Sequence, residues 1–164
     1  MKRITIVLAA LALATATCRA EDAIVTYKSL APDTALELAK TALDRCRKDG
    51  YQVAVVVLDR FGAPLVALRD RFAGIGAYNI ATGKAWTAVN FTRDTSDFVK
   101  AVKDGTLSAG LASLPNVTPL AGGMVIEAGG SLLGGVGVAG APGGDKDEAC
   151  AKAGLDAVRD KLDF

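Results

Sequence analysis

The chain has no histidine among its 164 residues. Histidine is the general base of Ser-His-Asp triads and Cys-His pairs, a frequent zinc ligand and a common axial ligand of haem iron. Its absence excludes histidine-dependent nucleophilic catalysis, histidine-based zinc sites and a histidine-ligated haem. Aromatic residues are also scarce, at 5% of the chain, so we expect a closely packed core of small residues.

The chain also has no large excess of positive or negative charge. The chain has 19 Lys and Arg against 18 Asp and Glu, which gives a net charge of +1. Nucleic-acid binding needs a basic surface that neutralises phosphates. The composition therefore argues against a nucleic-acid partner.

Long apolar runs are missing as well. The run over residues 4–16 is apolar apart from two threonines, but a membrane-spanning helix needs roughly 20 apolar residues. Lys2 and Arg3 precede this run, and small residues at Cys18 and Ala20 follow it, which is the pattern of a secretory signal peptide. A retained membrane anchor and a lipoprotein modified at Cys18 are less favoured alternatives.

These features predict the organisation and the location of the protein. We expect residues 1–20 to be a cleaved signal peptide and residues 21–164 to form a single domain. The protein is then periplasmic or secreted, with no stable membrane span.

Two of the three cysteines, Cys46 and Cys150, lie beyond the predicted signal peptide. An even number of cysteines in an exported protein favours a disulfide. This bridge would join the first and the last predicted helix. Two buried free thiols are the alternative.

Hydrophobic periodicity and turn residues predict the order of helices and strands. Helices are expected from Pro32 to just before Gly50, over 74–91, over 94–102, and from Asp145 to about Leu162. Strands are expected over 52–58 and 64–68, and over 124–128 and 131–139 around Gly129-Gly130. Residues 105–118 are expected to form a loop with room for one short strand. Two hairpins covered by helices predict an α+β domain with an antiparallel sheet.

Residues 135–140 match the G-x-G-x-x-G pattern of dinucleotide-binding loops. In that fold the glycines open a helix, but Pro142 and Gly144 come before the last predicted helix begins. Residues 141–164 are also too few for the helix and second strand that the fold requires. We therefore expect these glycines to allow close packing or a bulge in a strand.

Asp145, Asp147 and Glu148 form an acidic group at the start of the last predicted helix. Acidic side chains at this position cap backbone N–H groups and interact favourably with the helix dipole. Asp145 with Glu148 three residues later also matches a capping box. We therefore expect capping here in preference to a cation site.

Lys84 lies in the middle of an otherwise apolar predicted helix. A lysine there either extends its ammonium group to solvent or points into a cleft. Arg93 follows at the end of the helix, with hydroxyls at Thr95 and Ser96. Two cations and two hydroxyls could hold a carboxylate or a phosphate. On spacing alone, a solvated helix face beside a capped short helix is the favoured interpretation, and the anion site is the alternative.

Several segments, in one order, resemble the GlcG/HbpS-like family, also called the haem-degrading domain family. The first three are the strand that ends in Asp59 (51–59), the lysine-bearing helix segment (81–88) and an F-x-R-x-T-S segment (91–96). The others are a Gly-Gly strand start (122–126), the last glycine-rich strand (134–140) and part of the last helix (147–154). The resemblance implies a profilin-like α+β fold in which helices flank an antiparallel sheet. It also implies assembly into homo-oligomers and a link to haem.

The resemblance also suggests site residues. Lys84, Arg93, Thr95 and Gly123 match the family pattern, whereas Val125 stands where the family has proline. By this resemblance, Lys84 and Arg93 would pair with the carboxylates of haem.

The iron of a bound haem would need a ligand other than histidine. The candidates are tyrosine, methionine, cysteine or a weak oxygen donor. In this chain they include Tyr27, Tyr51, Tyr78 and Met124.

Three functions are compatible with these residues. The first is an exported haem-binding protein, with little or no catalysis, that is linked to haem handling or redox sensing. The second is a binding module for a small anionic metabolite that uses the same cations. The third is an oligomeric sensor-partner protein without catalysis.

Overall fold

The computed structural model describes residues 24–162 and has an α+β architecture, as the sequence predicts. Its sheet has four strands in the order β2-β1-β4-β3, and all neighbouring strands are antiparallel. The strands are β1 (Ala54–Asp59), β2 (Pro64–Arg69), β3 (Gly123–Ala128) and β4 (Ser131–Ala139). The predicted signal peptide lies outside the described residues.

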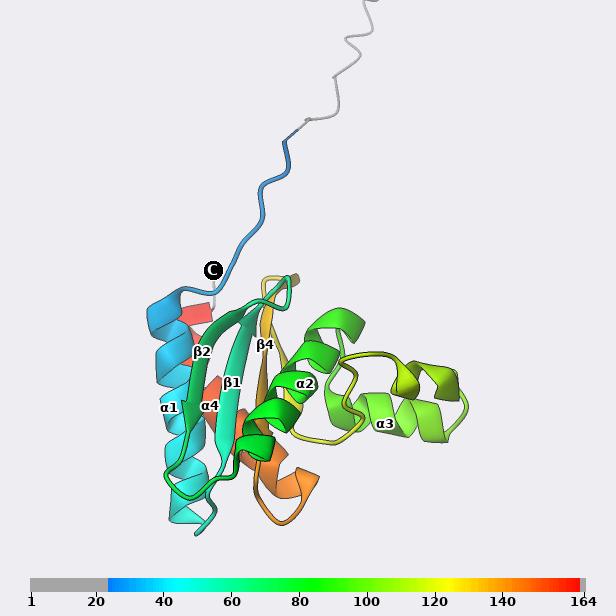
Figure 1. Cartoon of the computed structure of the whole chain (residues 1–164). Helices are drawn as coiled ribbons and strands as arrows, with labels where there is room; N and C mark the ends of the chain where they lie inside the picture. The colour runs from blue at the N-terminus through cyan, green and yellow to red at the C-terminus, as the bar shows by residue number, and fades with distance from the viewer. Residues whose placement is uncertain (1–23, 163–164) are drawn as a thin grey trace, which may run out of the picture.

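Helices cover both faces of the sheet (Figure 1). Helices α1 (Pro32–Lys48) and α4 (Gly144–Leu162) pack together on one face, where they share a core with Val55 and Val57 of β1. Helix α2 (Ile75–Phe91) covers the other face and packs on Val56 and Leu58. Strand β1 is therefore buried on both sides, which explains its continuous run of apolar residues.

The glycines of β4 allow α2 to approach the sheet closely, as the sequence analysis expects. A methyl group at Gly137 would overlap the carbonyl oxygen of Ala81, and one at Gly135 would lie 2.7 Å from Val89 Cγ2. At the tip of the β3–β4 hairpin, Gly129 and Gly130 have φ values of 53° and 71°. A two-residue turn of this kind suits the twist of paired strands.

Helix α3 (Thr95–Lys103) follows α2 and brings its first residues to the edge of the sheet. The hydroxyl of Thr95 accepts a hydrogen bond from the Gly123 N–H at 2.8 Å, and it lies 3.2 Å from the Gly123 carbonyl. The Asp94 carboxylate accepts one from the Val125 N–H at 2.8 Å. These contacts cover the outer edge of β3 where it begins.

The prediction of a short strand within the loop at 105–118 is wrong. Residues Ala109–Ser113 form a 3-10 helix, and the structure assigns no strand between 105 and 118. The Ser108 side chain accepts a hydrogen bond from the Gly110 N–H and so stabilises the start of this turn. The neighbouring edge of β3 already has partners in Asp94 and Thr95, so this segment has no strand to pair with there.

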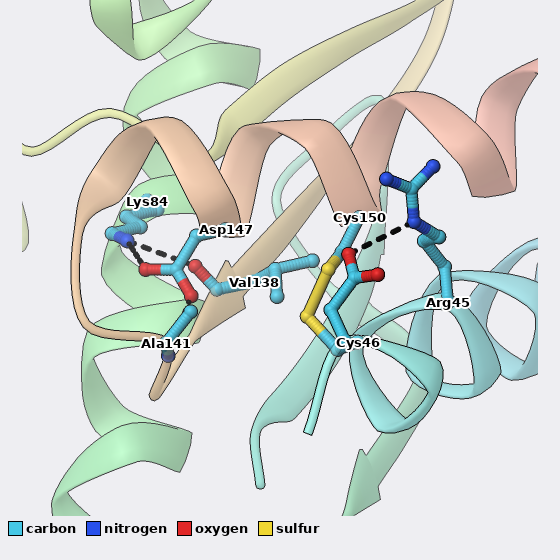
Figure 2. Close-up of a disulfide and its surroundings, with 8 residues drawn as sticks. Arg45, Cys46, Lys84, Val138, Ala141, Asp147 and Cys150 are labelled. Atoms are coloured by element: carbon cyan, nitrogen blue, oxygen red, sulfur yellow. Dashed lines mark hydrogen bonds and ion pairs between the residues drawn. A yellow bond between two sulfur atoms is a disulfide. The ribbon is translucent and has the colours of Figure 1, made fainter. Parts of the chain in front are cut away.

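A disulfide joins Cys46 of α1 to Cys150 of α4, which confirms the predicted bridge. The two Cα atoms are 5.5 Å apart, and both side chains are fully buried. Figure 2 shows that the bridge lies along α4 from the first turn of that helix, where Asp147 meets Lys84. Among residues 24–162, no helix combines the length and the apolarity that crossing a membrane requires.

Candidate functional site

Lys84 is buried in an ion pair at the centre of the molecule, so the expectation of a solvated helix face is wrong. Its side chain is 2% exposed. The ammonium group donates to Asp147 Oδ2 at 2.7 Å and to the carbonyl oxygen of Val138 at 2.9 Å (Figure 2). Helix α2, strand β4 and helix α4 therefore meet at one ammonium group.

Two glycines make room for the lysine side chain. Gly122 has a φ of +112°, and a Cβ there would lie 2.9 Å from Lys84 Nζ and 2.7 Å from Asp147 Cβ. A Cβ at Gly123 would overlap the carbonyl of Lys84 and approach Thr95. The Gly-Gly segment is thus required for packing around the lysine, and Thr95 and Gly123 are buried parts of this framework.

Asp147 binds side-chain and backbone donors outside its own helix, which corrects its expected role as a helix cap. Its Oδ1 accepts a hydrogen bond from the Ala141 N–H at 3.0 Å, while Oδ2 faces Lys84. Burial raises the pKa of Asp147, and Lys84 partly opposes this rise. The expected capping box is also wrong, because the Glu148 carboxylate accepts from the Ser96 hydroxyl at 3.0 Å.

A cavity of about 480 Å³ opens beside this ion pair. Lys84 and Asp147 are among its lining residues, and most of the remaining wall is apolar side chain or glycine backbone. Its other lining residues are Ile80, Val99, Pro119, Leu120, Ala121, Ala139, Gly140, Ala141, Gly143, Gly144 and Asp145.

The Lys84 ammonium group retains donor capacity at this cavity. An ammonium group has three N–H donors, and two of those of Lys84 have acceptors in Asp147 and Val138. The third can serve a ligand oxygen. The cavity also includes Gly143 and Gly144, around the start of α4, where the helix dipole favours a negative group. The Asp145 carboxylate, which pairs with Lys146, also lies there. The arrangement can hold an anionic group attached to an apolar body.

The other predicted site residues do not gather at this cavity. Arg93 is exposed just beyond the end of α2 and is not a lining residue. Tyr78 lines a second cavity on α2, and Met124 lines a third with Ser96 and Glu148. The structure therefore does not bring Lys84 and Arg93 together in one hollow.

The candidate iron ligands are also dispersed. Tyr27 packs edge-on against Phe61, and Tyr51 packs against the main core. Cys46 and Cys150 are bonded to each other. Within the described part of the chain, no group of three or more His, Cys, Asp or Glu side chains could hold a metal ion.

Sequence reasoning missed the partners of the lysine. Asp147, Val138 and Gly122 come from segments 38 to 63 residues away from Lys84 in the chain. One signal was available, namely a single lysine in a helix whose other buried residues are uncharged: Ala81, Ala85, Thr87, Ala88 and Val89. A buried lysine needs an anionic partner, but the sequence alone did not indicate which carboxylate it was.

The chain is similar to proteins of one family over most of its length. The model of the family described as "Haem degrading protein HbpS-like" matches residues 30–156. The crystal structure of a double mutant of HbpS from Streptomyces reticuli is 34% identical, with a TM-score of 0.78, and the match covers 95% of this chain and 99% of that one.

A further solved structure contains haem. The PduOC:haem complex is 27% identical with a TM-score of 0.73, and the match covers 79% of this chain and 94% of that one. The corrinoid adenosyltransferase PduO of Salmonella typhimurium is 30% identical over 106 residues, which is 63% of this chain and 32% of that protein. PduO of Citrobacter freundii is similar in the same way, at 31% identity. The chain thus spans about a third of the length of these curated relatives.

Proposed function

Because the chain belongs to the HbpS-like family of haem-degrading proteins, we propose that it binds haem in the cavity beside Lys84 and Asp147. The observation that carries this proposal is the buried Lys84 ammonium group, which lines a largely apolar cavity and uses two of its three N–H donors within residues 24–162. A haem propionate is a carboxylate on an apolar macrocycle, so it matches both features.

The cavity walls suit the macrocycle. Ile80, Val99 and Leu120 provide apolar side chains around the opening, and cavities of a few hundred Å³ are typical of small-molecule sites. Asp147 already neutralises much of the charge of Lys84, so the propionate gains one charge-assisted hydrogen bond and the field of the α4 terminus. Arg93 lies outside the lining, and we assign the propionate to Lys84 alone.

The cavity offers the iron no strong ligand. Its lining contains no tyrosine, methionine or cysteine, and the chain has no histidine. Tyr78 and Met124 line other cavities. Binding should therefore depend on the porphyrin and its carboxylates, with weak ligation of the iron. This is the chemistry of a protein that holds haem reversibly, and we propose haem handling without tight catalytic binding.

We also propose that the protein acts after export, as a homo-oligomer in a haem-linked or redox-sensing pathway. Two features support export: the signal-peptide pattern of residues 1–20 and the disulfide between Cys46 and Cys150, since disulfides persist in oxidising compartments. Cell fractionation, intact mass and size-exclusion chromatography with light scattering test these statements. A cytoplasmic, uncleaved monomer would contradict them.

The test of haem binding compares three porphyrins on the oxidised protein. Haemin and iron-free protoporphyrin IX should bind with affinities within about threefold of each other, because iron ligation contributes little. Protoporphyrin IX dimethyl ester should bind at least about tenfold more weakly, since it lacks the charged carboxylates. Soret absorbance and porphyrin fluorescence measure these affinities.

Two leucines provide a matched pair of variants. Leu120 lines the cavity and is 52% exposed, whereas Leu114 is 47% exposed and does not line it. Leu120→Glu should weaken porphyrin binding by about tenfold or more because it places a carboxylate in the wall, and Leu114→Glu should leave binding unchanged. No Soret change with micromolar haemin, or equal effects of the two substitutions, would overturn the proposal.

A small anionic metabolite is the second candidate, and the missing iron ligand favours it. Lys84 and the start of α4 would bind a carboxylate or phosphate on any small apolar body. Native mass spectrometry of protein purified without added haem separates the two ligands. A co-purified organic anion, together with weak porphyrin binding, supports this candidate.

A further inference from the structure

A second cavity, of about 410 Å³, lies on the opposite flank of α2 from the ion pair. It opens between the helix and the loop that follows the 3-10 helix. Its lining residues are Tyr78, Asn79, Thr82, Gly83, Trp86, Asn116, Val117 and Thr118, and it shares none of them with the cavity at Lys84.

The helix side of this cavity is an aromatic stripe. Tyr78, Thr82 and Trp86 are spaced four residues apart, so they lie on one face of α2. The Thr82 hydroxyl donates to the Tyr78 carbonyl at 2.9 Å, which uses its hydrogen bond within the helix. The β1–β2 turn supports the indole, because a Cβ at Gly62 would lie 3.4 Å from Trp86 Cδ1. Tyr78 and Trp86 are also partly buried against the core beneath α2, so both line the cavity from the helix side.

The loop side is fixed against the helix. The Thr118 N–H donates to the Thr87 hydroxyl at 2.8 Å, and that hydroxyl donates to the Gly83 carbonyl at 2.7 Å. A methyl group at Gly83 would overlap the Thr118 hydroxyl, so glycine at this position lets the loop approach the helix closely. The cavity is therefore formed before any ligand binds.

The backbone at the rim of the cavity is in an uncommon conformation. Asn116 has a φ of 67°, which only asparagine, aspartate and glycine adopt readily. Asn116 lies in a turn that is closed by a hydrogen bond from the Val117 N–H to the Leu114 carbonyl at 3.2 Å.

The chemistry of the lining selects a neutral ligand. No Lys, Arg, Asp or Glu is among the lining residues. Asn79 and Asn116 each offer an amide that can donate and accept, Trp86 offers an indole N–H and Tyr78 a hydroxyl. Their side chains make no hydrogen bond to the rest of residues 24–162. Aromatic faces beside uncharged amides suit a ring that has C–H groups on its face and hydroxyls at its edge.

We propose that this cavity binds a neutral, polyhydroxylated ring of the size of one monosaccharide unit. The stripe of Tyr78 and Trp86 contacts the C–H face of the ring, and Asn79 and Asn116 bond its hydroxyls. This site is independent of the haem site, since the two cavities have no residue in common.

Trp86 makes the proposal directly measurable, because it is the single tryptophan of the chain. Its fluorescence therefore reports on this cavity. Methyl-β-D-glucoside, methyl-β-D-galactoside and N-acetyl-D-glucosamine are titrated into the oxidised protein up to about 50 mM, where a millimolar Kd is saturated. At least one of them should give a saturable change, and the charged analogue glucuronate should bind more weakly.

Two asparagines give a matched pair of variants. Asn116→Gly keeps the φ of 67° without strain, so the fold should be retained while binding weakens about fivefold to tenfold through the lost amide. Asn90 is exposed on the same helix, outside the lining, and its side chain donates to the Trp86 backbone carbonyl at 2.9 Å. Asn90→Ala should change at most the starting fluorescence of Trp86 and leave the affinity unchanged.

Three results would overturn the assignment. One is the absence of a saturable change with all three sugars, and a second is an equal loss in the two variants. The third is an unaltered response to sugars combined with weaker haemin binding in Asn116→Gly, which would make this cavity the haem site. If both variants bind haemin with the wild-type affinity, the haem proposal stands, and the sugar titrations test only the second cavity.

Discussion

The buried pair of Lys84 and Asp147 gives the sharpest prediction about stability. Lys84→Met removes the charge while keeping a long unbranched side chain, and Asp147→Asn keeps an oxygen for the Ala141 N–H. Each substitution leaves the other member of the pair charged and buried. The double variant Lys84→Met/Asp147→Asn leaves no charge at this position.

The structure determines the size of each effect. The two side chains are 2% and 5% exposed and their charged atoms are 2.7 Å apart. Removing one partner of such a buried pair costs about 3–5 kcal/mol, whereas replacing both partners costs much less. We expect each single variant to lose about 3–5 kcal/mol of unfolding free energy, and the double variant to lose less than either single variant.

Guanidinium unfolding of the oxidised protein at pH 7 measures the whole cycle. The pH dependence adds a second readout for Lys84→Met. Without Lys84, only the hydrogen bond from the Ala141 N–H still opposes the effect of burial, so the pKa of Asp147 is raised further. The folded state then holds the Asp147 proton to higher pH than the unfolded state does. Stability is then lost as pH rises through that pKa, and the deficit of the variant should be larger at pH 8 than at pH 5. Additive single effects, or a deficit independent of pH, would refute the reasoning.

Three further predictions concern the framework. Replacing Cys46 and Cys150 by alanine should lower the free energy of unfolding by about 4 kcal/mol, because the bridge spans 104 residues. The reduced wild-type protein is the control. A loss below about 1 kcal/mol would contradict stabilisation through loop-closure entropy. Burial raises the pKa of Asp94, so the folded wild type should gain stability over Asp94→Asn as pH falls through that pKa; parallel profiles of Tm against pH would refute this. Gly137→Ala should cost about 3 kcal/mol or more in thermal unfolding because its methyl overlaps α2. Gly50→Ala, with a φ of +84° and open space around it, should cost only about 1 kcal/mol, and equal costs would argue against close packing at β4.

Local sequence patterns were sufficient to predict most elements of the fold. The run of valines before Asp59 forms β1, and the Gly129-Gly130 pair forms the turn between β3 and β4. Helix α1 begins at Pro32 and ends before Gly50. These predictions hold because burial on both faces, positive φ and a proline start each impose a residue type at one position.

The prediction failed where the decisive contact is not local. The segment after Gly105 has apolar residues that suit a short strand, but a strand also needs an edge to pair with. That edge of β3 is occupied by Asp94 and Thr95 at its start. Which segment covers an edge depends on the tertiary arrangement, and no periodicity within 105–118 reveals it.

The candidate site shows the same limit more strongly. Lys84 could be selected from the sequence because a charge is unusual in an apolar helix. Asp147 could not, because an acid in the first turn of a helix has a sufficient local explanation in the helix dipole. Whether Asp147 caps its helix or pairs with Lys84 depends on how the lysine side chain passes Gly122. That geometry forms only when α2, β4 and α4 pack together.

The disulfide and the ion pair belong to one structural unit on α4. Asp147 and Cys150 are three residues apart, so they lie on neighbouring positions of the same helix face. Cys150 fixes that face against α1, and Asp147 fixes it against α2 through Lys84. The first turns of α4 are therefore held from both sides of the sheet, and the cavity at their start keeps its shape without a ligand. A preformed cavity of this kind lowers the ordering cost of binding, which suits the haem site that we propose, where the iron has no strong ligand.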